Sequence, residues 1–478
     1  MSKVYITTTL PYVNADPHIG FALEIIQADV WVRTQRLLGN DVFFNTGTDE
    51  HGLKIYENAK AQKKDTQLYV DEYAEKFKKL SEALNLDEHK FIRTTEEHHK
   101  KAAQEFWKRC EKNGDIYKKN YKINYCVGCE LPKTDSELVD GKCPLHPTKK
   151  LMIIEEENYF FKFSKYQEKL LEHYKKNPDF VKPANRLQEV TNFVKGGLED
   201  FSISRLKKNM PWGVAVPGDE EHVMYVWFDA LINYISTLGW PEDEKKFKDY
   251  WPGTQVAGKD NLRQQSAMWQ SMLMSAGLPQ SKQIFIHGFI TMNGEKMSKS
   301  TGNVINPFDL VDKYGTDAVR YYLLREIPGL DDGDFSIRRF EEVFNADLAN
   351  TIGNLVARVT TLCQQNNVVF DEKEDEENNV KDRLEKSGFS DHIKQFEFNL
   401  ALEELWREYK VIDNEINKYE PWKKHGEDLI SHLKLYLKTI RHITYYLQPF
   451  LPNTAKKIMI GTSGKIQKIQ SLFPRLQK

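Results

Sequence analysis

Apolar positions near the start of the chain predict a strand, a helix and a second strand. Residues 4–7 are a short apolar and β-branched run. After a turn rich in Pro, Asn and Asp, apolar residues recur at helical spacing from Leu23 to Leu37, and residues 41–44 form a second strand-like run. Because this is the order of a βαβ unit, the N-terminal half is predicted to be α/β with a parallel sheet. Ligand sites of such sheets lie at the carboxyl ends of the strands.

The middle of the chain follows a different pattern. From 117 to 217, short β-like pieces surround a group of cysteines, and strand-like segments return at 224–228 and 284–287. We therefore predict an insertion that splits one sheet.

The last third is predicted to be helical. Apolar residues from Phe340 to Leu362 step along one helical face, and no strand signal follows residue 338. The polar run 371–379 is expected to be a solvated loop between helices.

Composition narrows the class of protein but does not indicate a partner. The 478 residues exceed what one hydrophobic core holds, so several domains are expected. Hydrophobic (40%) and charged (29%) fractions are those of a globular protein. Lys plus Arg (68) nearly balance Asp plus Glu (70), which neither requires nor excludes a nucleic acid partner. The sequence shows no membrane-length apolar run and no signal-peptide stretch at its start, so we expect a cytoplasmic location.

Three of the five cysteines form a metal-binding pattern. Cys126 and Cys129 are followed, after thirteen residues, by Cys143 and His146. In a reducing compartment such a cluster is more typical of metal ligands than of disulfides. Four ligands close a tetrahedral site, so we expect one structural Zn²⁺. The alternative is a coincidental set of reduced thiols.

The segment between the first strand and its helix is a candidate phosphate site. A helix N-terminus favours an anion because its N–H groups are unpaired and its dipole is positive there. His18 would add a donor to a phosphate oxygen, and Gly20 would let a nucleotide approach the backbone. Taken alone, a helix-capping histidine explains the segment better.

A second candidate phosphate site is the lysine loop, residues 294–302. Lys296 and Lys299 lie there among Gly, Ser and Thr, before a helix that Asn306 and Pro307 would start. A solvated loop would have the same composition.

The pairing of HIG after the first strand with KMSKS after a late strand resembles the class I aminoacyl-tRNA synthetases. Within that class the chain resembles the methionyl-tRNA synthetase family from residue 4 to about 450. The further matching stretches are TTLPYVNADPHIG, GTDEHG (47–52), VWFDA (226–230), GKD (258–260), the zinc knuckle and PW (421–422).

The resemblance implies a methionine site in which Asp49 pairs with the ammonium group. The residues expected around methionine are Leu10, Tyr12, Asp49, Trp227, Ala230, Tyr234, Gln265 and Trp269. The spacing of Trp227, Ala230 and Tyr234 equally suits a helical core stripe.

The resemblance also implies an ATP site with Mg²⁺. Its expected residues are His18, Gly20, Gly258, Asp260 and Lys299, and the expected catalytic residues are His18, Lys296 and Lys299. Asp260 would reach the ribose and Lys299 the leaving pyrophosphate.

In the helical third the resemblance implies an anticodon site made of Asn350, Asn354, Arg358 and Trp422. Amides, a guanidinium and an indole suit unpaired bases, because they offer hydrogen bonds and stacking. By itself this helix face is better explained as solvated.

Two positions depart from the family pattern. Phe21 stands where the family has a second histidine, which removes one phosphate donor. Gln264 and Gln265 stand where an aromatic residue and a histidine are usual, and Gln265 would offer an amide donor near the thioether.

We therefore expect an enzyme that activates methionine with ATP and transfers it to initiator and elongator tRNA(Met). The alternatives are a cysteinyl or other class I synthetase and a non-catalytic tRNA-binding relative. A monomer is expected because the sequence ends soon after the helical third. The expected domains are a Rossmann-like first half (1–116), a connective insertion with the zinc knuckle (117–217), the second half (218–290), a KMSKS and stem-contact region (291–338) and a helical anticodon-binding domain (339–478).

Overall fold

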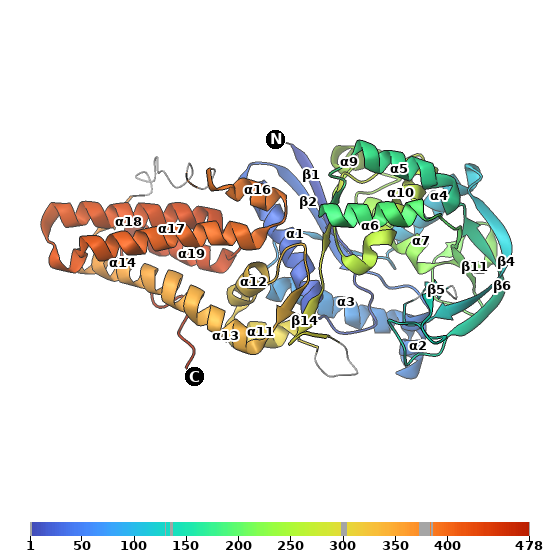
Figure 1. The fold of residues 1–478 in the computed structure, drawn as a ribbon, viewed down its shortest axis with the longest axis horizontal. Helices are drawn as coiled ribbons and strands as arrows, with labels where there is room; N and C mark the ends of the chain where they lie inside the picture. Colours follow the sequence, from blue (N-terminus) through green and yellow to red (C-terminus); the bar gives the residue numbers. More distant parts are fainter. Residues whose placement is uncertain are drawn as a thin grey trace. The chain divides into compact units, whose positions relative to one another are not determined.

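The computed structural model describes residues 2–129, 131–133, 137–297, 304–371, 383 and 386–477 (Figure 1). Two compact units are present. The first comprises residues 1–17, 39–79 and 88–286, and the second comprises residues 18–38, 80–87 and 287–478.

The first unit is built on a six-stranded sheet. The strands, in spatial order, are β3 (Lys90–Arg93), β2 (Asp41–Thr48), β1 (Lys3–Thr8), β12 (Thr254–Gly258), β13 (Gln283–His287) and β7 (Val181–Lys182). The pairs β3 with β2, β2 with β1, β1 with β12, and β13 with β7 are parallel. The chain runs outward from β1 to β3 on one side and from β12 to β13 on the other, so the strand order reverses between β1 and β12. Open α/β sheets bind ligands at such a switch point.

Three strands of the sheet, β1, β2 and β13, form where the apolar pattern predicts them, whereas β3, β7 and β12 were not predicted. Residues 5–8 of β1 are all buried, and β12 is buried throughout. The helices of this unit are α2 (Leu53–Ala61), α3 (Thr66–Ala83, mostly in this unit), α4 (Glu97–Lys112), α5 (Gln167–Lys176), α6 (Ala184–Lys195), α7 (Val226–Ala230), α8 (Asn233–Ser236), α9 (Glu244–Tyr250) and α10 (Trp269–Ser275). The strand-like interpretation of 224–228 was wrong beyond Met224, because Val226–Ala230 is helical.

The cysteine-containing segment forms a separate antiparallel sheet. Its strands are β5 (Leu131–Lys133), β4 (Ile116–Cys126), β6 (Met152–Phe161) and β8 (Phe201–Ser202), and a three-stranded sheet follows from β10 (Ala215–Val216), β11 (Asp219–Met224) and β9 (Ser204–Leu206). The long pair β4 and β6 is in register from Ile116 with Phe161 to Tyr125 with Met152. The expected 117–217 segment also contributes α5, α6 and β7, and β7 extends the parallel sheet.

The second unit contains the helix after β1 and the C-terminal region. Its elements are α1 (Ile19–Leu37), β14 (Ile290–Met292), β15 (Glu295–Lys296), α11 (Pro307–Tyr314), α12 (Thr316–Arg325), β16 (Gly333–Phe335), α13 (Ile337–Val343), a π-helix (Phe344–Gly353), α14 (Asn354–Gln365), β17 (Val369–Phe370), α16 (Phe389–Lys394), α17 (Phe398–Tyr419), a 3₁₀ turn (Pro421–Lys423), α18 (Gly426–Leu447), α19 (Pro452–Gly461) and β18 (Gly464–Lys465).

The predicted helical bundle is confirmed. Helix α18 packs against α14, α17 and α19 (Figure 1). The apolar face from Phe340 to Val359 is buried, and Leu362 at its end is half-buried. The expectation of no strand after residue 338 was wrong, because the short strands β17 and β18 pair there. The predicted loop 371–379 lies, apart from Asp371, outside the described residues.

A buried ion pair joins α1 to the bundle. The Arg320 guanidinium lies 2.7 Å from the Asp29 carboxylate, and both side chains are fully buried. Arg320 also donates to the backbone carbonyls of Leu84, Pro449 and Phe450 at 2.8–3.1 Å. The charge is therefore compensated on all sides, as a buried guanidinium requires.

No helix among the described residues is long and apolar enough to cross a membrane.

Candidate functional site

The predicted methionine-site residues begin at the carboxyl edge of the parallel sheet. Tyr12 and Asp49 pair as a parallel bridge just beyond β1 and β2. The Asp49 N–H donates to the Pro11 carbonyl at 3.0 Å, and the Val13 N–H donates to the Asp49 carbonyl at 3.1 Å. The carboxylate of Asp49 is thus held at the edge, with only 8% of the residue exposed.

Other expected residues reach the same edge from β12. Thr8 is level with Val256, so Leu10 and Gly258 each follow two residues later at the switch point. Asp260 is exposed in a 3₁₀ turn directly after the strand. These positions suit a ligand lying across β1 and β12.

The segment after β2 is fixed by buried polar contacts. The Glu50 carboxylate accepts two hydrogen bonds from Arg93, at 2.7 and 2.9 Å, and one from the Thr48 hydroxyl at 2.6 Å. The Trp212 indole donates to the Glu50 carbonyl at 2.6 Å. Gly47 has to be glycine, because a Cβ there would lie 1.8 Å from the Ile92 carbonyl oxygen.

A second part of the expected pocket forms between α8 and α10. The Gln265 amide donates to the Tyr234 hydroxyl at 2.7 Å and accepts from the Gln255 amide at 2.9 Å. The Tyr234 and Trp269 rings meet edge to face, with centroids 5.9 Å apart. Gln265 therefore has polar partners inside the protein, and its amide orients the phenol. Gln264, by contrast, is buried with its side-chain oxygen unpaired among the described groups.

Buried histidines connect the two parts. The Asp229 carboxylate lies 2.6 Å from His51 Nδ1 and 2.8 Å from His99 Nε2. His99 Nδ1 lies 2.9 Å from the Ser236 hydroxyl. Burial alone would raise the pKa of Asp229, but the His51 charge and the hydrogen bonds from both histidines lower it to about 2. Asp229 is therefore a carboxylate at neutral pH.

His18 caps α1 in the second unit. Its Nδ1 accepts from the Gly20 N–H at 3.2 Å, so the proton of the neutral ring is on Nε2. A Cβ at Gly20 would lie 3.1 Å from the His18 ring, which explains glycine there. The first turn of α1 carries no acidic residue, and Phe21 is buried.

The chain leaving the lysine loop returns to this helix start. The Ile19 N–H donates to the Ile305 carbonyl at 3.3 Å. Asn306 then caps α11, accepting from the Phe308 N–H at 3.0 Å, as predicted. Lys299 lies outside the described residues, and Lys296 is placed only as part of β15.

The predicted metal ligands form one cluster. The ligand atoms of Cys126, Cys129, Cys143 and His146 all lie within 4.8 Å of one another. The Cys129 and Cys143 sulfurs are 3.5 Å apart, close to the roughly 3.8 Å of a tetrahedral site with zinc–sulfur bonds of about 2.3 Å. A Cβ at Gly128 would lie 2.5 Å from the His146 ring, so the knuckle turn depends on this glycine. Three sulfurs and an imidazole fit Zn²⁺.

The predicted anticodon residues lie on the helical region. Asn350 and Asn354 are exposed, and Trp422 is 50% exposed after the end of α17. Arg358 contacts the Asp413 carboxylate and donates to the Asn417 amide oxygen at 3.0 Å. Because Asp413 and Asn417 lie in the last turns of α17, Arg358 is held next to the segment that carries Trp422.

Comparisons with known proteins agree with this architecture. Residues 4–152 and 148–360 match the family model described as "tRNA synthetases class I (M)". The methionine-tRNA ligase of Thermotoga maritima is 41% identical over 95% of this chain and 74% of its own length. That of Thermosynechococcus vestitus is 42% identical over 98% of this chain and 92% of its own. The Mycobacterium tuberculosis methionyl-tRNA synthetase in complex with methionyl-adenylate superposes with a TM-score of 0.92, at 36% identity over 99% of this chain and 100% of that one.

The chain belongs to the methionyl-tRNA synthetase family. The resemblance that its motifs suggested is thereby confirmed.

Within the family stretch GTDEHG, the sequence predicts a role only for Asp49. The buried partners Glu50, His51, His99 and Asp229 were not predicted. The available signal was chemical: carboxylates and histidines within strand-end and apolar segments have to be paired when they are buried.

Proposed function

We propose that this protein is a methionine-tRNA ligase. In the first step the methionine carboxylate attacks the α-phosphorus of ATP, forming methionyl-adenylate and releasing pyrophosphate. In the second step a 3′-terminal ribose hydroxyl of tRNA(Met) attacks the adenylate carbonyl carbon, forming the ester and releasing AMP. Neither step needs a strong base to start, so positioning and charge stabilisation supply the catalysis.

One observation carries this proposal within a family already established. The hydrogen bond from Ile19 to Ile305 joins the first residue of the HIG-capped helix to the segment directly after KMSKS. The described residues that follow KMSKS therefore lie at the start of the His18-capped helix, and this contact supports the proposal that the two motifs bind one triphosphate.

His18 and the two lysines would meet the phosphates. His18 offers Nε2 as the donor, because Nδ1 is used by Gly20. We propose Lys296 and Lys299 as the loop lysines, Gly20 and Gly258 as the positions where the backbone approaches the nucleotide, and Asp260 as the ribose contact. Bound Mg²⁺ would supply charge neutralisation on the phosphates.

The methionine site would combine one charge with an apolar wall. Asp49 would bind the ammonium, and Leu10, Tyr12, Trp227 and Ala230 would contact the side chain. Tyr234, Gln265 and Trp269 would form the far wall. The Gln265 amide is already hydrogen-bonded to Tyr234 and Gln255. It would therefore present fewer unpaired polar groups to the methionine side chain.

Recognition of tRNA would use the exposed helical surface. Asn350, Asn354 and Arg358 would bind base edges, and Trp422 would stack on a base.

The zinc site is proposed as structural. Four protein ligands leave no open position, so the ion would hold the knuckle turns between β4 and β6. Cys143→Ser should lower bound zinc from one ion per chain to nearly none, while Cys363→Ser, a buried cysteine outside the cluster, should leave it unchanged. Mass spectrometry of the native protein measures both.

Amino-acid-dependent ATP–pyrophosphate exchange tests the proposed activity. Exchange with methionine, followed by charging of tRNA(Met), is the expected result. Exchange only with cysteine or another amino acid would identify that amino acid as the substrate. Exchange with no amino acid would favour a non-catalytic tRNA-binding protein.

The predicted domain limits, the cytoplasmic location and the monomeric state belong to the same proposal. Limited proteolysis, cell fractionation and light scattering test them in turn.

A further inference from the structure

A buried chain of hydrogen bonds runs through the first unit and ends on both parts of the proposed methionine pocket. It consists of Ser236, His99, Asp229 and His51, and each of these residues is at most 3% exposed. Successive polar atoms are 2.9, 2.8 and 2.6 Å apart. The chain uses four separate segments: α8, α4, α7 and the segment after β2.

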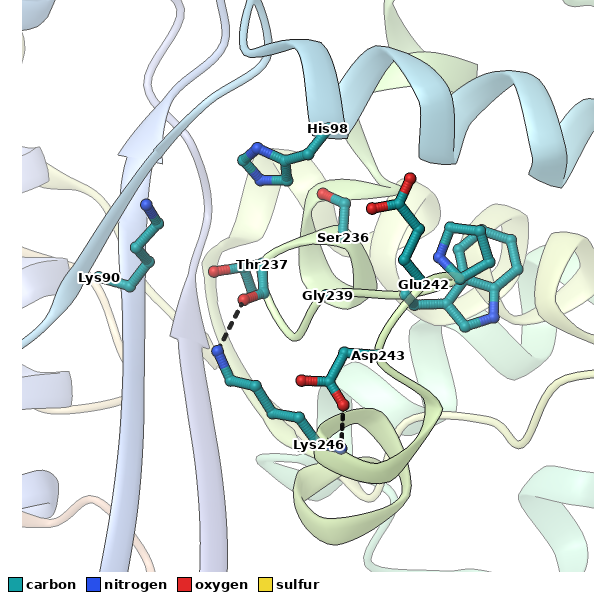
Figure 2. A pocket seen from close by; sticks show the side chains of 10 residues that line it. Lys90, His98, Ser236, Thr237, Gly239, Glu242, Asp243 and Lys246 are labelled. Atoms are coloured by element: carbon teal, nitrogen blue, oxygen red, sulfur yellow. Dashed lines mark hydrogen bonds between the residues drawn. The ribbon is translucent and has the colours of Figure 1, made fainter.

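Each end of the chain has a distinct surrounding. His51 follows Asp49 by two residues, and its ring lies 5.9 Å from that of Trp212. At the other end, Ser236 lines an open cavity of about 260 Å³, whose wall also includes His98 and Thr237 (Figure 2). Ser236 itself is only 1% exposed, so both ends of the hydrogen-bonded chain are enclosed by protein.

The Asp229 carboxylate gives helix α7 two polar contacts that apolar side chains could not make. It lies in the five-residue helix α7, between Trp227 and Ala230, and its two carboxylate oxygens are used by two different histidines. A short helix has few backbone hydrogen bonds of its own, so side-chain contacts determine where it lies. One carboxylate therefore links α7 both to α4 and to the segment that carries Asp49.

We propose that Asp229, together with His51 and His99, is a positioning residue for the methionine site. It does not touch the substrate; it holds Trp227 and Ala230 at a fixed place relative to Asp49. This inference rests on the proposed function for its ligand, and it adds residues to which no role was assigned.

The test needs a control that loses an equally buried carboxylate elsewhere. Asp115 is such a residue: it is fully buried and accepts hydrogen bonds from Lys165, Tyr166, Ser275 and Asn113. Asp229→Asn and Asp115→Asn remove the same charge and change the same atoms. Any general loss of stability is expected in both.

In methionine-dependent exchange, Asp229→Asn should raise the KM for methionine at least tenfold and leave the KM for ATP within twofold. Asp115→Asn should leave both within twofold. His51→Asn retains a donor near the place of Nδ1 and should keep the KM for methionine within about threefold, whereas His51→Ala should raise it like Asp229→Asn. A methionine KM that rises equally in both aspartate variants, or an equal rise for methionine and ATP, would overturn the proposal.

Amide hydrogen exchange of the ligand-free protein gives a readout that does not depend on activity. Peptides covering 48–52 and 226–230 should lose protection at least tenfold in Asp229→Asn and keep it in Asp115→Asn. Unchanged protection in Asp229→Asn would refute the positioning role even if the wild-type protein activates methionine. If Asp229→Asn loses protection but the wild-type protein does not activate methionine, the proposed substrate is refuted and the positioning role is retained.

Discussion

The proposed methionine pocket and the proposed anticodon surface differ in how their residues are held before a ligand binds. In the pocket, Asp49 and Tyr234 are buried and tied to their neighbours before any ligand is present. On the helical surface, Asn350 and Asn354 are exposed, and half of Trp422 faces solvent. A small substrate with few atoms needs a preorganised site, because it brings little binding energy to pay for ordering one. A large RNA brings enough contacts to bury an exposed indole on arrival.

The largest expected effect comes from removing the charge of the pocket. Asp49→Asn leaves the methionine ammonium without its carboxylate, which costs about 3 kcal/mol, or roughly 150-fold in kcat/KM for methionine. Pyrophosphate exchange measures the loss. Asp249→Asn, which breaks only the partly exposed pair with Lys3, should change it less than twofold. Equal effects of the two variants would mean that Asp49 is not the ammonium contact.

On the helical surface a smaller effect in a different assay is expected. Trp422→Ala removes one stacking platform, worth about 2 kcal/mol or roughly 30-fold in tRNA charging, and should leave pyrophosphate exchange unchanged. Tyr445→Ala removes an exposed aromatic residue from α18 and serves as the control. Comparable losses in charging and exchange would contradict a role confined to tRNA.

Acid should weaken the pocket through Asp229. Its pKa of about 2 lies below the ordinary value of 3.8, so its stabilisation is complete above about pH 4 and is lost as the pH falls towards 2. Between pH 6 and pH 3 the difference in free energy of unfolding between the wild type and Asp229→Asn should shrink by about 1 kcal/mol. Urea unfolding at both pH values measures it, and a constant difference would exclude the ionised, hydrogen-bonded carboxylate.

The smallest effect should come from the ion pair on the helical surface. Asp413 neutralises Arg358 in the free protein. Asp413→Asn should therefore tighten tRNA binding about threefold at low salt, and the gain should disappear at high salt. Glu403→Gln makes the same charge change on α17 beside Arg407. A similar gain from Glu403→Gln would indicate a general charge effect, not a local one.

Periodicity was a reliable guide where elements are long. The strand at 4–7, the helix from Leu23 to Leu37 and the buried face from Phe340 to Val359 all follow from spacing. Short elements were not accessible. The two-residue strand β7 has no period to detect, and the apolar run at 226–228 suits a strand as well as the helix it forms.

For the site, the sequence indicated candidate contact residues but not what supports them. The four residues of the predicted metal cluster are close in sequence, so their spacing was sufficient to predict that they come together. Asp229 and His51 are 178 residues apart, and nothing in either segment indicates the other. Such pairings depend on tertiary packing, which a single sequence does not display.

The buried Asp29–Arg320 pair has a practical consequence for protein engineering. Helix α1, which starts at His18, is anchored to α12 and to carbonyls at the base of the bundle, and it falls in the same compact unit as residues 287–478. In a chimaera that takes only its C-terminal half from a relative, this helix would pack against residues that did not evolve with it. Recombination should therefore transfer residues 18–38 together with residues 287–478, although Leu38 and His287 are 249 positions apart in the sequence.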